Sequence, residues 1–423
     1  MKDEKLYRGY KVRLFPTPEQ EELMWKHVHT ARFLYNYMLD LQIGRYKNSR
    51  KHLSGYDMCN ELKYMKQQKE FEWLREISHS TLAQVCLDLD VAYKMFFKSN
   101  FGFPKFKKKN KCKQIFPITP DGNKTYFLND NCAVIPKIGH IKCCLSQDME
   151  FGKGNKIINP RIEYVRSSGK WILSFQLFFN KQEIELTDKS IGIDLGIKEL
   201  AVVAVGDKKM VFHNINKSNR MRVLKKKEKH IQRAINRKYR TCNGFGTPSK
   251  GQTWEKSKKI EKYEQILREI EARMANIRKN YIHQITRQLV NMLPSKVVME
   301  DLNITNIMKN KHLAKSVGEQ NFYFFIQTMK YKCEEYGIKF VQADRYFPSS
   351  KTCSDCGHKK KDLKLKDRTY VCPVCGLTID RDYNAAINLM NYTENKTTTD
   401  KLATKVERKK KKKAPKTEIV SVA

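Results

Sequence analysis

The fold is decided by the stretch IGIDLGIKELAVVA, residues 191–204. An apolar, β-branched run carries one carboxylate, Asp194, turns at Gly196 and resumes as a second apolar run, which predicts two adjacent strands joined by a tight turn. A buried carboxylate is costly unless it finds a partner, a proton or a metal ion. Taken alone, an aspartate at a strand end beside a glycine turn favours a structural role for Asp194.

Two later stretches favour a different role. KVVMEDLN, residues 296–303, predicts another apolar strand that ends in carboxylates, and DRDYNAAIN, residues 380–388, places two more at a predicted helix start. Three acidic points on separate elements fit a site for magnesium or manganese, and two such ions about 4 Å apart can clamp both oxygens of a phosphoryl displacement. This acidic pattern is typical of an RNase H-like nuclease core.

These stretches occur together with other motifs in one order along the chain. The order is YKVRLFPTPEQEELM, ARFLYNYML, FPKFKKK, IPKIGHIK, GIDLGIKELAVV, VVMEDLNI, PSSKTCSDCG, YVCPVCG and DRDYNAAIN. It resembles the TnpB family, the RNA-guided nucleases of bacterial transposons, and the related miniature type V CRISPR effectors. The similarity runs from about Tyr7 to about Met390, and the tail from Asn391 onward has no clear match.

The resemblance implies an α/β plus β-barrel fold. It consists of an RNase H-like (RuvC) nuclease core with an inserted zinc ribbon, and an N-terminal oligonucleotide-binding-type barrel with an inserted helical lobe. The expected segments are 1–16 (first strand of a wedge-type barrel), 17–112 (helical recognition lobe), 113–186 (rest of the barrel), 187–350 (RuvC-like core), 351–378 (zinc ribbon), 379–392 (last RuvC segment) and 393–423 (basic disordered tail).

The resemblance also implies an activity: a divalent-metal-dependent DNA endonuclease that uses a guide RNA, binds target double-stranded DNA and reads a short motif beside the target. Carried over residue by residue, the catalytic metal ligands are Asp194, Glu300 and Asp382, holding two magnesium or manganese ions, with Asp380 as the fallback for Asp382. Asp301 is expected on the opposite strand face. The alternatives are an RNA-guided DNA-binding regulator without cleavage, which the three retained carboxylates argue against, and an RNase H-like DNA strand-transferase. The oligomeric state does not follow from the sequence.

The cysteines carry the most specific spacing in the chain. Two CxxC pairs, each followed by glycine, predict one closed tetrahedral zinc site of structural type, with ligands Cys353, Cys356, Cys372 and Cys375. The alternative, two disulfides, fits neither the glycine turns nor a reducing compartment.

The charge of the chain favours a polyanionic partner. Lys and Arg number 83 against 45 Asp and Glu, a formal net charge of +38, and the compact state repels itself unless a polyanion neutralises this excess. Nucleic acid is the first candidate and a membrane surface the second. The sequence has no apolar run long enough for a transmembrane helix and no signal-peptide pattern at its start, so a bacterial cytosolic or nucleoid location is expected.

Basic and aromatic residues alternate in GFPKFKKK, residues 102–109. Cations meet phosphates while rings stack on bases in such patterns, so Lys105, Phe106, Lys107 and Lys108 are candidate nucleic-acid contacts. The alternative is a solvated loop with one buried phenylalanine. Arg345 and Lys351, near the zinc ribbon, are candidate DNA contacts.

Periodicity and turn residues predict the remaining elements. A capping box at Thr17 and Gln20 opens a helix that continues to about residue 47. Strands are expected at 7–15, 171–179 and 339–343, helices at 80–99, 217–240, 254–292 (one helix or a pair) and 323–336, and a mobile lid at 304–312.

Overall fold

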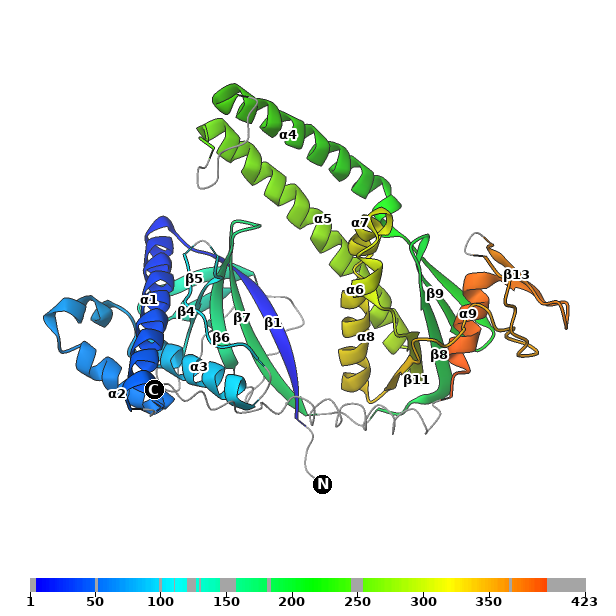
Figure 1. Cartoon of the computed structure of the whole chain (residues 1–423), viewed down its shortest axis with the longest axis horizontal. Helices are drawn as coiled ribbons and strands as arrows, with labels where there is room; N and C mark the ends of the chain where they lie inside the picture. The colour runs from blue at the N-terminus through cyan, green and yellow to red at the C-terminus, as the bar shows by residue number, and fades with distance from the viewer. Residues whose placement is uncertain are drawn as a thin grey trace, which may run out of the picture. The chain divides into compact units, whose positions relative to one another are not determined.

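The structure is a computed structural model that describes residues 5–49, 52–98, 101–109, 111–119, 127–128, 131–144, 157–180, 184–244, 254–364 and 367–393. Contacts between residues divide the chain into two units (Figure 1). The first unit contains residues 1–181 and 231–272, and the second contains residues 182–230 and 273–423. The predicted basic tail from residue 394 onward lies outside the described residues.

The first unit is built on an antiparallel sheet of seven described strands in the order β2-β6-β7-β1-β5-β4-β3. Its central strand β1 pairs with β7 from Lys5↔Asn180 to Leu14↔Trp171 and with β5 at its end. The predicted strands at 7–15 and 171–179 are therefore confirmed and are neighbours. The strands are β1 (Lys5–Phe15), β2 (Gln114–Pro117), β3 (Phe127–Leu128), β4 (Cys132–Ile135), β5 (Gly139–Cys144), β6 (Ile158–Val165) and β7 (Lys170–Asn180).

Helices occupy the chain between β1 and β2. They are α1 (Pro18–Ser49), α2 (Gly55–Met65), the 3₁₀ helix η1 (Lys69–Glu76) and α3 (His79–Lys98). The predicted capping box is confirmed: the backbone N–H of Gln20 donates to the Thr17 hydroxyl at 3.3 Å, and the Thr17 N–H donates to the Gln20 side chain at 3.1 Å. Trp25 of α1 contacts Trp171 of β7 at a centroid distance of 5.1 Å, so this helix packs on the sheet.

The second unit is built on a mixed sheet of five strands in the order β10-β9-β8-β11-β12. The first three are antiparallel neighbours, whereas β8, β11 and β12 run parallel. The predicted hairpin is confirmed, since the N–H of Gly196 donates to the carbonyl of Leu200 at 3.2 Å. The strands are β8 (Thr187–Leu195), β9 (Glu199–Val205), β10 (Lys208–His213), β11 (Pro294–Glu300) and β12 (Lys339–Ala343).

Helices cover both faces of this sheet (Figure 1). Ile191 and Ile193 of β8 pack into one apolar cluster with residues of α5 (Lys258–Val290) and α8 (Phe322–Tyr336). Val202 and Ala204 of β9 pack on the opposite face against α9 (Arg381–Met390). Because strand side chains alternate between faces, an apolar run of this kind is buried on both sides.

Gly192 allows α9 to lie directly on the central strand. A Cβ atom at this position would stand 2.0 Å from the carbonyl oxygen of Ala386 and 2.3 Å from the backbone nitrogen of Met390. These are backbone atoms of the helix, so no side-chain rotation can relieve the overlap. Glycine is therefore required here by close approach rather than by its backbone angles.

The other helices of the chain are η2 (Ile215–Lys217), α4 (Asn219–Asn243), α6 (Ile304–Ile307) and α7 (Lys311–Gln320), and β13 (Thr369–Val371) and β14 (Thr378–Asp380) form a small separate hairpin. Residues 254–292, predicted as one helix or a pair, contain the single helix α5. The expected lid at 304–312 contains α6 and the start of α7, and its mobility stays a prediction. None of the described helices has the length and apolar character needed to cross a membrane.

Candidate functional site

Three carboxylates predicted as metal ligands lie together at one end of the second sheet. Asp194 lies near the end of β8 and Glu300 ends the parallel neighbour β11, where Ile193 pairs with Met299. Asp382 lies in the first turn of α9, which lies directly on Gly192 of β8. Desolvation, followed by the charges of Glu300 and Asp382, raises the pKa of Asp194 well above its usual value. Charges act on a pKa in this way only at short range, so Glu300 and Asp382 both lie close to Asp194.

Neighbouring side chains hold the other two carboxylates. The Ser349 hydroxyl donates to Glu300, although burial still raises the pKa of this carboxyl. Asp382 lies 3.2 Å from the Arg381 guanidinium and 3.8 Å from that of Arg368. These arginines offset part of the negative charge and fix the orientation of Asp382.

The two neighbouring aspartates have other partners. Asp380 caps α9 by accepting the N–H of Tyr383 at 2.9 Å and lies 3.5 Å from the Lys209 ammonium. Asp301 pairs with Arg345 at 2.7 Å. The arrangement therefore favours Asp382 over Asp380 as the third member of the cluster, and it gives the candidate DNA contact Arg345 an acidic partner within the protein.

The loop after Asp194 is held by side chains that the sequence did not single out. Gln320 of α7 donates to the carbonyl of Ile197 at 3.0 Å, and Asn214 donates to the same carbonyl at 2.9 Å. Lys217 donates to the carbonyl of Lys198 at 3.0 Å. These donors fix the turn that follows the carboxylate. Their separation from it in sequence leaves no local pattern that predicts them.

The four predicted cysteine ligands form one cluster. Their Sγ atoms all lie within 4.8 Å of one another, with Cys353–Cys375 at 3.6 Å and Cys356–Cys372 at 3.5 Å. The remaining described cysteines belong to no such group. The cluster therefore offers four sulfur ligands at one point, as the spacing predicts.

The two CxxC turns have matching backbone geometry. Gly357 and Gly376 both adopt a φ of +74°, in the left-handed region that favours glycine. Each donates its N–H to the carbonyl of the first cysteine of its pair, at 3.1 Å in both turns. The predicted role of the glycine after each pair is therefore confirmed.

Two asparagines attach the first of these turns to α9. The Asn384 side chain accepts the N–H of Ser354 at 2.9 Å and donates to the carbonyl of Thr352 at 2.7 Å. Asn388, one turn further along the helix, donates to the carbonyl of Ser349 at 2.7 Å. Both asparagines are buried. The cysteine cluster and the helix that carries Asp382 are thus joined by hydrogen bonds.

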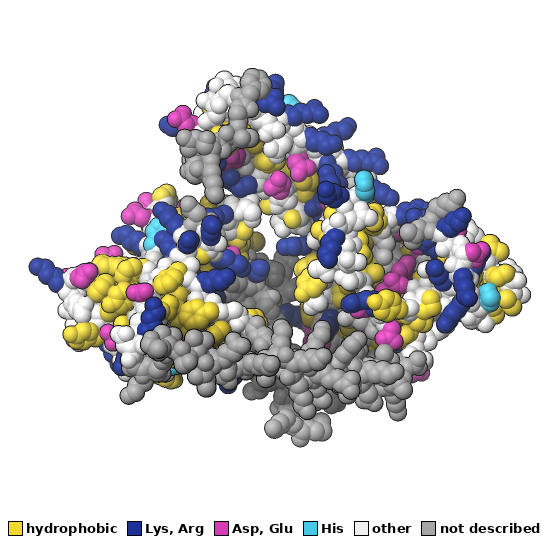
Figure 2. Space-filling model, viewed as in Figure 1, with side chains coloured by type: hydrophobic (Ala, Val, Ile, Leu, Met, Phe, Trp, Pro, Cys, Tyr) yellow, Lys and Arg dark blue, Asp and Glu magenta, His cyan; other side chains and the backbone are white. Residues whose placement is uncertain are grey.

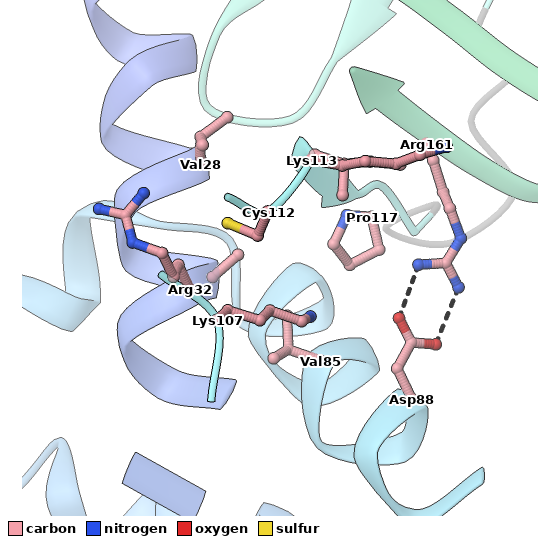
Figure 3. A pocket seen from close by; sticks show the side chains of 11 residues that line it. Val28, Arg32, Val85, Asp88, Lys107, Cys112, Lys113, Pro117 and Arg161 are labelled. Atoms are coloured by element: carbon pink, nitrogen blue, oxygen red, sulfur yellow. Dashed lines mark hydrogen bonds and ion pairs between the residues drawn. The ribbon is translucent and has the colours of Figure 1, made fainter. Parts of the chain in front are cut away.

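The candidate nucleic-acid contacts in the first unit differ in accessibility. Lys105, Phe106 and Lys108 are exposed. Lys107 instead extends into a small pocket, where its ammonium lies 3.6 Å from the centroid of the Tyr35 ring (Figure 3). Desolvation lowers the pKa of Lys107. Lys107 is therefore turned away from the surface that the other three share.

Further basic residues lie on the surface. Lys351 is exposed, and its ammonium lies 3.5 Å from the carbonyl of Lys361. Lys and Arg side chains also gather along α4 (Figure 2). In the part of the chain that the structure describes, three of the exposed ones have no acidic partner and recur at helical spacing: Arg222, Lys226 and Lys229.

Models of known families match three parts of the chain. Residues 180–311 match the OrfB_IS605 "Probable transposase" model, residues 322–389 match a "Cas12f1-like, TNB domain" and residues 1–51 match the "Helix-turn-helix domain" of the OrfB_IS605 group. In this structure the described part of that last range forms β1 and α1.

Two similar proteins carry the name "Putative RNA-guided DNA endonuclease". The one from Streptomyces pristinaespiralis is 26% identical over 383 residues, which cover 90% of this chain and 88% of that protein. InsQ from Escherichia coli (strain K12) is 26% identical over 402 residues, covering 91% and 92%. Among solved structures, a "Cas12f1-sgRNA-target DNA complex" matches with a TM-score of 0.55 and 15% identity, covering 92% of this chain and 99% of that chain.

The fold is thus that of the miniature Cas12 effectors, with a zinc-ribbon-like domain of the type found in Cas12f1. The match to the OrfB_IS605 "Probable transposase" model and the two relatives that match along most of their length add a similarity to proteins of transposons. Along about nine-tenths of its length, the chain is thus similar to proteins of the TnpB type.

Proposed function

We propose that the protein is an RNA-guided DNA endonuclease with a single RuvC-like site formed by Asp194, Glu300 and Asp382. The observation that carries this proposal is the gathering of three carboxylates from β8, β11 and α9 at one end of a mixed sheet. The relatives named as RNA-guided DNA endonucleases match along most of their length, which supports the same activity here.

The strand order supports an RNase H-like core. β8 is the central strand: β9 and β10 lie on one side of it in antiparallel pairing, and β11 and β12, which run parallel to β8, lie on the other. In the first unit, an antiparallel sheet whose first two strands are separated by the helices α1 to α3 supports a wedge-type barrel with an inserted recognition lobe. The segment boundaries expected from the sequence are proposed unchanged.

The donor set of the carboxylate cluster fits magnesium or manganese. Hard divalent cations prefer carboxylate oxygens. Burial, followed by the charges of Glu300 and Asp382, raises the pKa of Asp194, and a bound cation would compensate both effects. Asp194, Glu300 and Asp382 would hold a pair of ions, which supply an activated water and stabilise the leaving 3′ oxygen. Ser349 would keep Glu300 oriented, while Arg381 and Arg368 do the same for Asp382.

The four cysteines would hold one structural zinc ion. A regular tetrahedron with Zn–S bonds of about 2.3 Å has edges of about 3.8 Å. The nearest Sγ–Sγ distances, 3.5 and 3.6 Å, are close to that value. With four protein ligands no position remains for water, so the proposed zinc stabilises the fold and takes no part in the reaction.

The proposed partners are a guide RNA and a target DNA duplex. A net charge of +38 suits partners with many phosphates. The guide would supply sequence specificity by base pairing, and the protein would read the heteroduplex by shape together with a short flanking motif. Lys105, Phe106, Lys108, Arg345 and Lys351 are the proposed contacts, and the bacterial cytosol or nucleoid is the proposed place of action.

The decisive experiment measures metal-dependent cleavage by the protein purified with its co-expressed RNA. Asp194→Ala should abolish cleavage of a matched target and leave RNA binding intact. Asp301→Ala is the matched control, because Asp301 follows Glu300 directly in the sequence but is paired with Arg345. Wild-type cleavage by the Asp194→Ala protein would refute the assigned site. Sequence-specific cutting by protein stripped of RNA would refute guidance, and binding without any cutting would favour a regulator.

A further inference from the structure

An open groove of about 800 Å³ lies on the first unit beside the loop that follows α3. None of the described residues that line it is acidic. Its walls combine apolar residues with several lysines, and the lining is Ile43, Phe103, Pro104, Lys105, Phe106, Lys107, Lys108, Lys111 and Cys112. Size, apolar walls and one sign of charge together describe a site for a ligand that is both aromatic and anionic.

Two phenylalanines present ring surface at this groove. Phe103 makes T-shaped contacts with Tyr93 and Phe96 at centroid distances of 5.5 and 5.4 Å, yet 45% of it stays exposed. Phe106 is 48% exposed and has no aromatic neighbour among the described residues. Exposed rings of this kind lose apolar hydration when a flat partner stacks on them.

Side-chain hydrogen bonds hold the backbone of the loop at two points, Lys107 and Cys112. The Asn36 side chain donates to the carbonyl of Lys107 at 3.0 Å and accepts its N–H at 2.8 Å. Gln114 donates to the carbonyl of Cys112 at 2.8 Å. A groove fixed before the ligand arrives loses little conformational entropy on binding.

The lysines that line the groove divide into two groups. Lys105, Lys108 and Lys111 are exposed at the groove. Lys107 borders the groove as well, but it also lines the small pocket where Arg161 and Asp88 form a bidentate ion pair at 2.6 and 2.8 Å (Figure 3). The anionic part of a ligand therefore meets the first three lysines, and Lys107 secures the loop.

We propose that this groove binds an unpaired nucleotide of a single strand, with its base stacked on Phe106 and flanking phosphates at Lys105, Lys108 and Lys111. Single-strand sites combine a cationic groove with rings on which bases stack, whereas a base inside a duplex has both faces covered by its neighbours. The inference rests on the proposed nucleic-acid function. The strand is either an unpaired part of the RNA or an unpaired stretch of DNA.

The test uses the full chain, freed of RNA in high salt, and 12-nucleotide single strands of RNA and of DNA with a central 2-aminopurine. Stacking on Phe106 should quench the 2-aminopurine, and Phe106→Leu should weaken binding by roughly 5- to 150-fold and remove most of the quenching. Phe106→Trp should restore both. Tyr64→Leu is the control, because Tyr64 is 59% exposed on α2 and does not line the groove.

The outcomes are distinct. Quenching that depends on Phe106 supports the site, and the strand that shows it more strongly identifies the source as RNA or DNA. Equal affinities of Phe106→Leu and Tyr64→Leu would overturn the proposal, as would an equal loss of binding for the fully paired duplex. Guided cleavage measured on the same wild-type preparation tests the proposed function separately, because that activity requires Asp194 and this binding does not.

Discussion

Gly192→Ala tests the assembly of the carboxylate cluster most directly. The added Cβ would lie 2.0 Å from the carbonyl oxygen of Ala386, whereas real Cβ atoms essentially never approach closer than 3.0 Å. Helix α9 must therefore move away from β8 by about 1 Å or more. Because Asp382 lies in the first turn of this helix, the same movement separates Asp382 from Asp194.

The magnitude follows from two general observations. Overpacking a core costs about 1–3 kcal/mol, and each kcal/mol lowers the melting temperature of a domain of roughly 200 residues by about 2–4 °C. A displacement of about 1 Å at a catalytic group costs about a hundredfold in rate. The variant should thus remain folded at 25 °C, melt several degrees lower and cleave about a hundredfold more slowly.

The assay compares calorimetric melting and single-turnover cleavage for Gly192→Ala and Gly9→Ala. Gly9 lies in β1, and a Cβ added there would meet no atom within 4 Å. It therefore reports the effect of replacing a strand glycine without an overlap. Wild-type melting and cleavage for Gly192→Ala would show that α9 does not need this close approach, and would refute the reasoning.

Three further predictions address other parts of the chain. Cys372→Ser should lower the zinc content and the melting temperature, whereas Cys242→Ser, at an exposed cysteine outside the cluster, should not; absence of zinc from the intact protein by elemental analysis would contradict the site. Desolvation lowers the pKa of buried His27. The stability that neutral His27 contributes is therefore present above the unfolded pKa of about 6.5 and is lost as the pH falls through the folded pKa. Between pH 7.5 and 5 the melting temperature should fall less steeply for His27→Leu than for the wild type, and equal slopes would argue against this role. Alanine at three positions of α4, namely Arg222, Lys226 and Lys229, should weaken nucleic-acid binding to all sequences alike. The slope of log K against log salt concentration should fall by about one per residue, and an unchanged slope would argue against contact between α4 and nucleic acid.

The sequence predicted the elements whose signals are local. The strands around Asp194 and Glu300 are short apolar runs, the start of α1 has a capping box, and the cysteine turns have glycines at fixed offsets. All the residues of each pattern lie within a short stretch of the chain, so the sequence alone is enough to predict the element. The acidic ends of the separate elements suggested a shared metal site, and the family resemblance assigned Asp194, Glu300 and Asp382 to it.

Features that depend on distant residues were not predicted. The sequence gives no indication that Lys107 turns toward the Tyr35 ring while Lys105 stays exposed, because the ring lies on α1, far from this loop in the sequence. Likewise, no local pattern indicates that the Asn384 side chain binds the backbone of the first cysteine turn. Helix α2 (Gly55–Met65) was missed, although its capping box at Ser54 and Asp57 is a local signal.

The position of α9 has a consequence for the order in which the protein becomes active during synthesis. The helix that lies on Gly192 and brings Asp382 to the cluster is made almost 190 residues after β8. The residues that line the groove of the first unit are synthesised long before that. A nascent chain therefore contains the residues of the groove before the helix that carries Asp382 exists, and a chain that ends before residue 381 lacks one of the three proposed metal ligands.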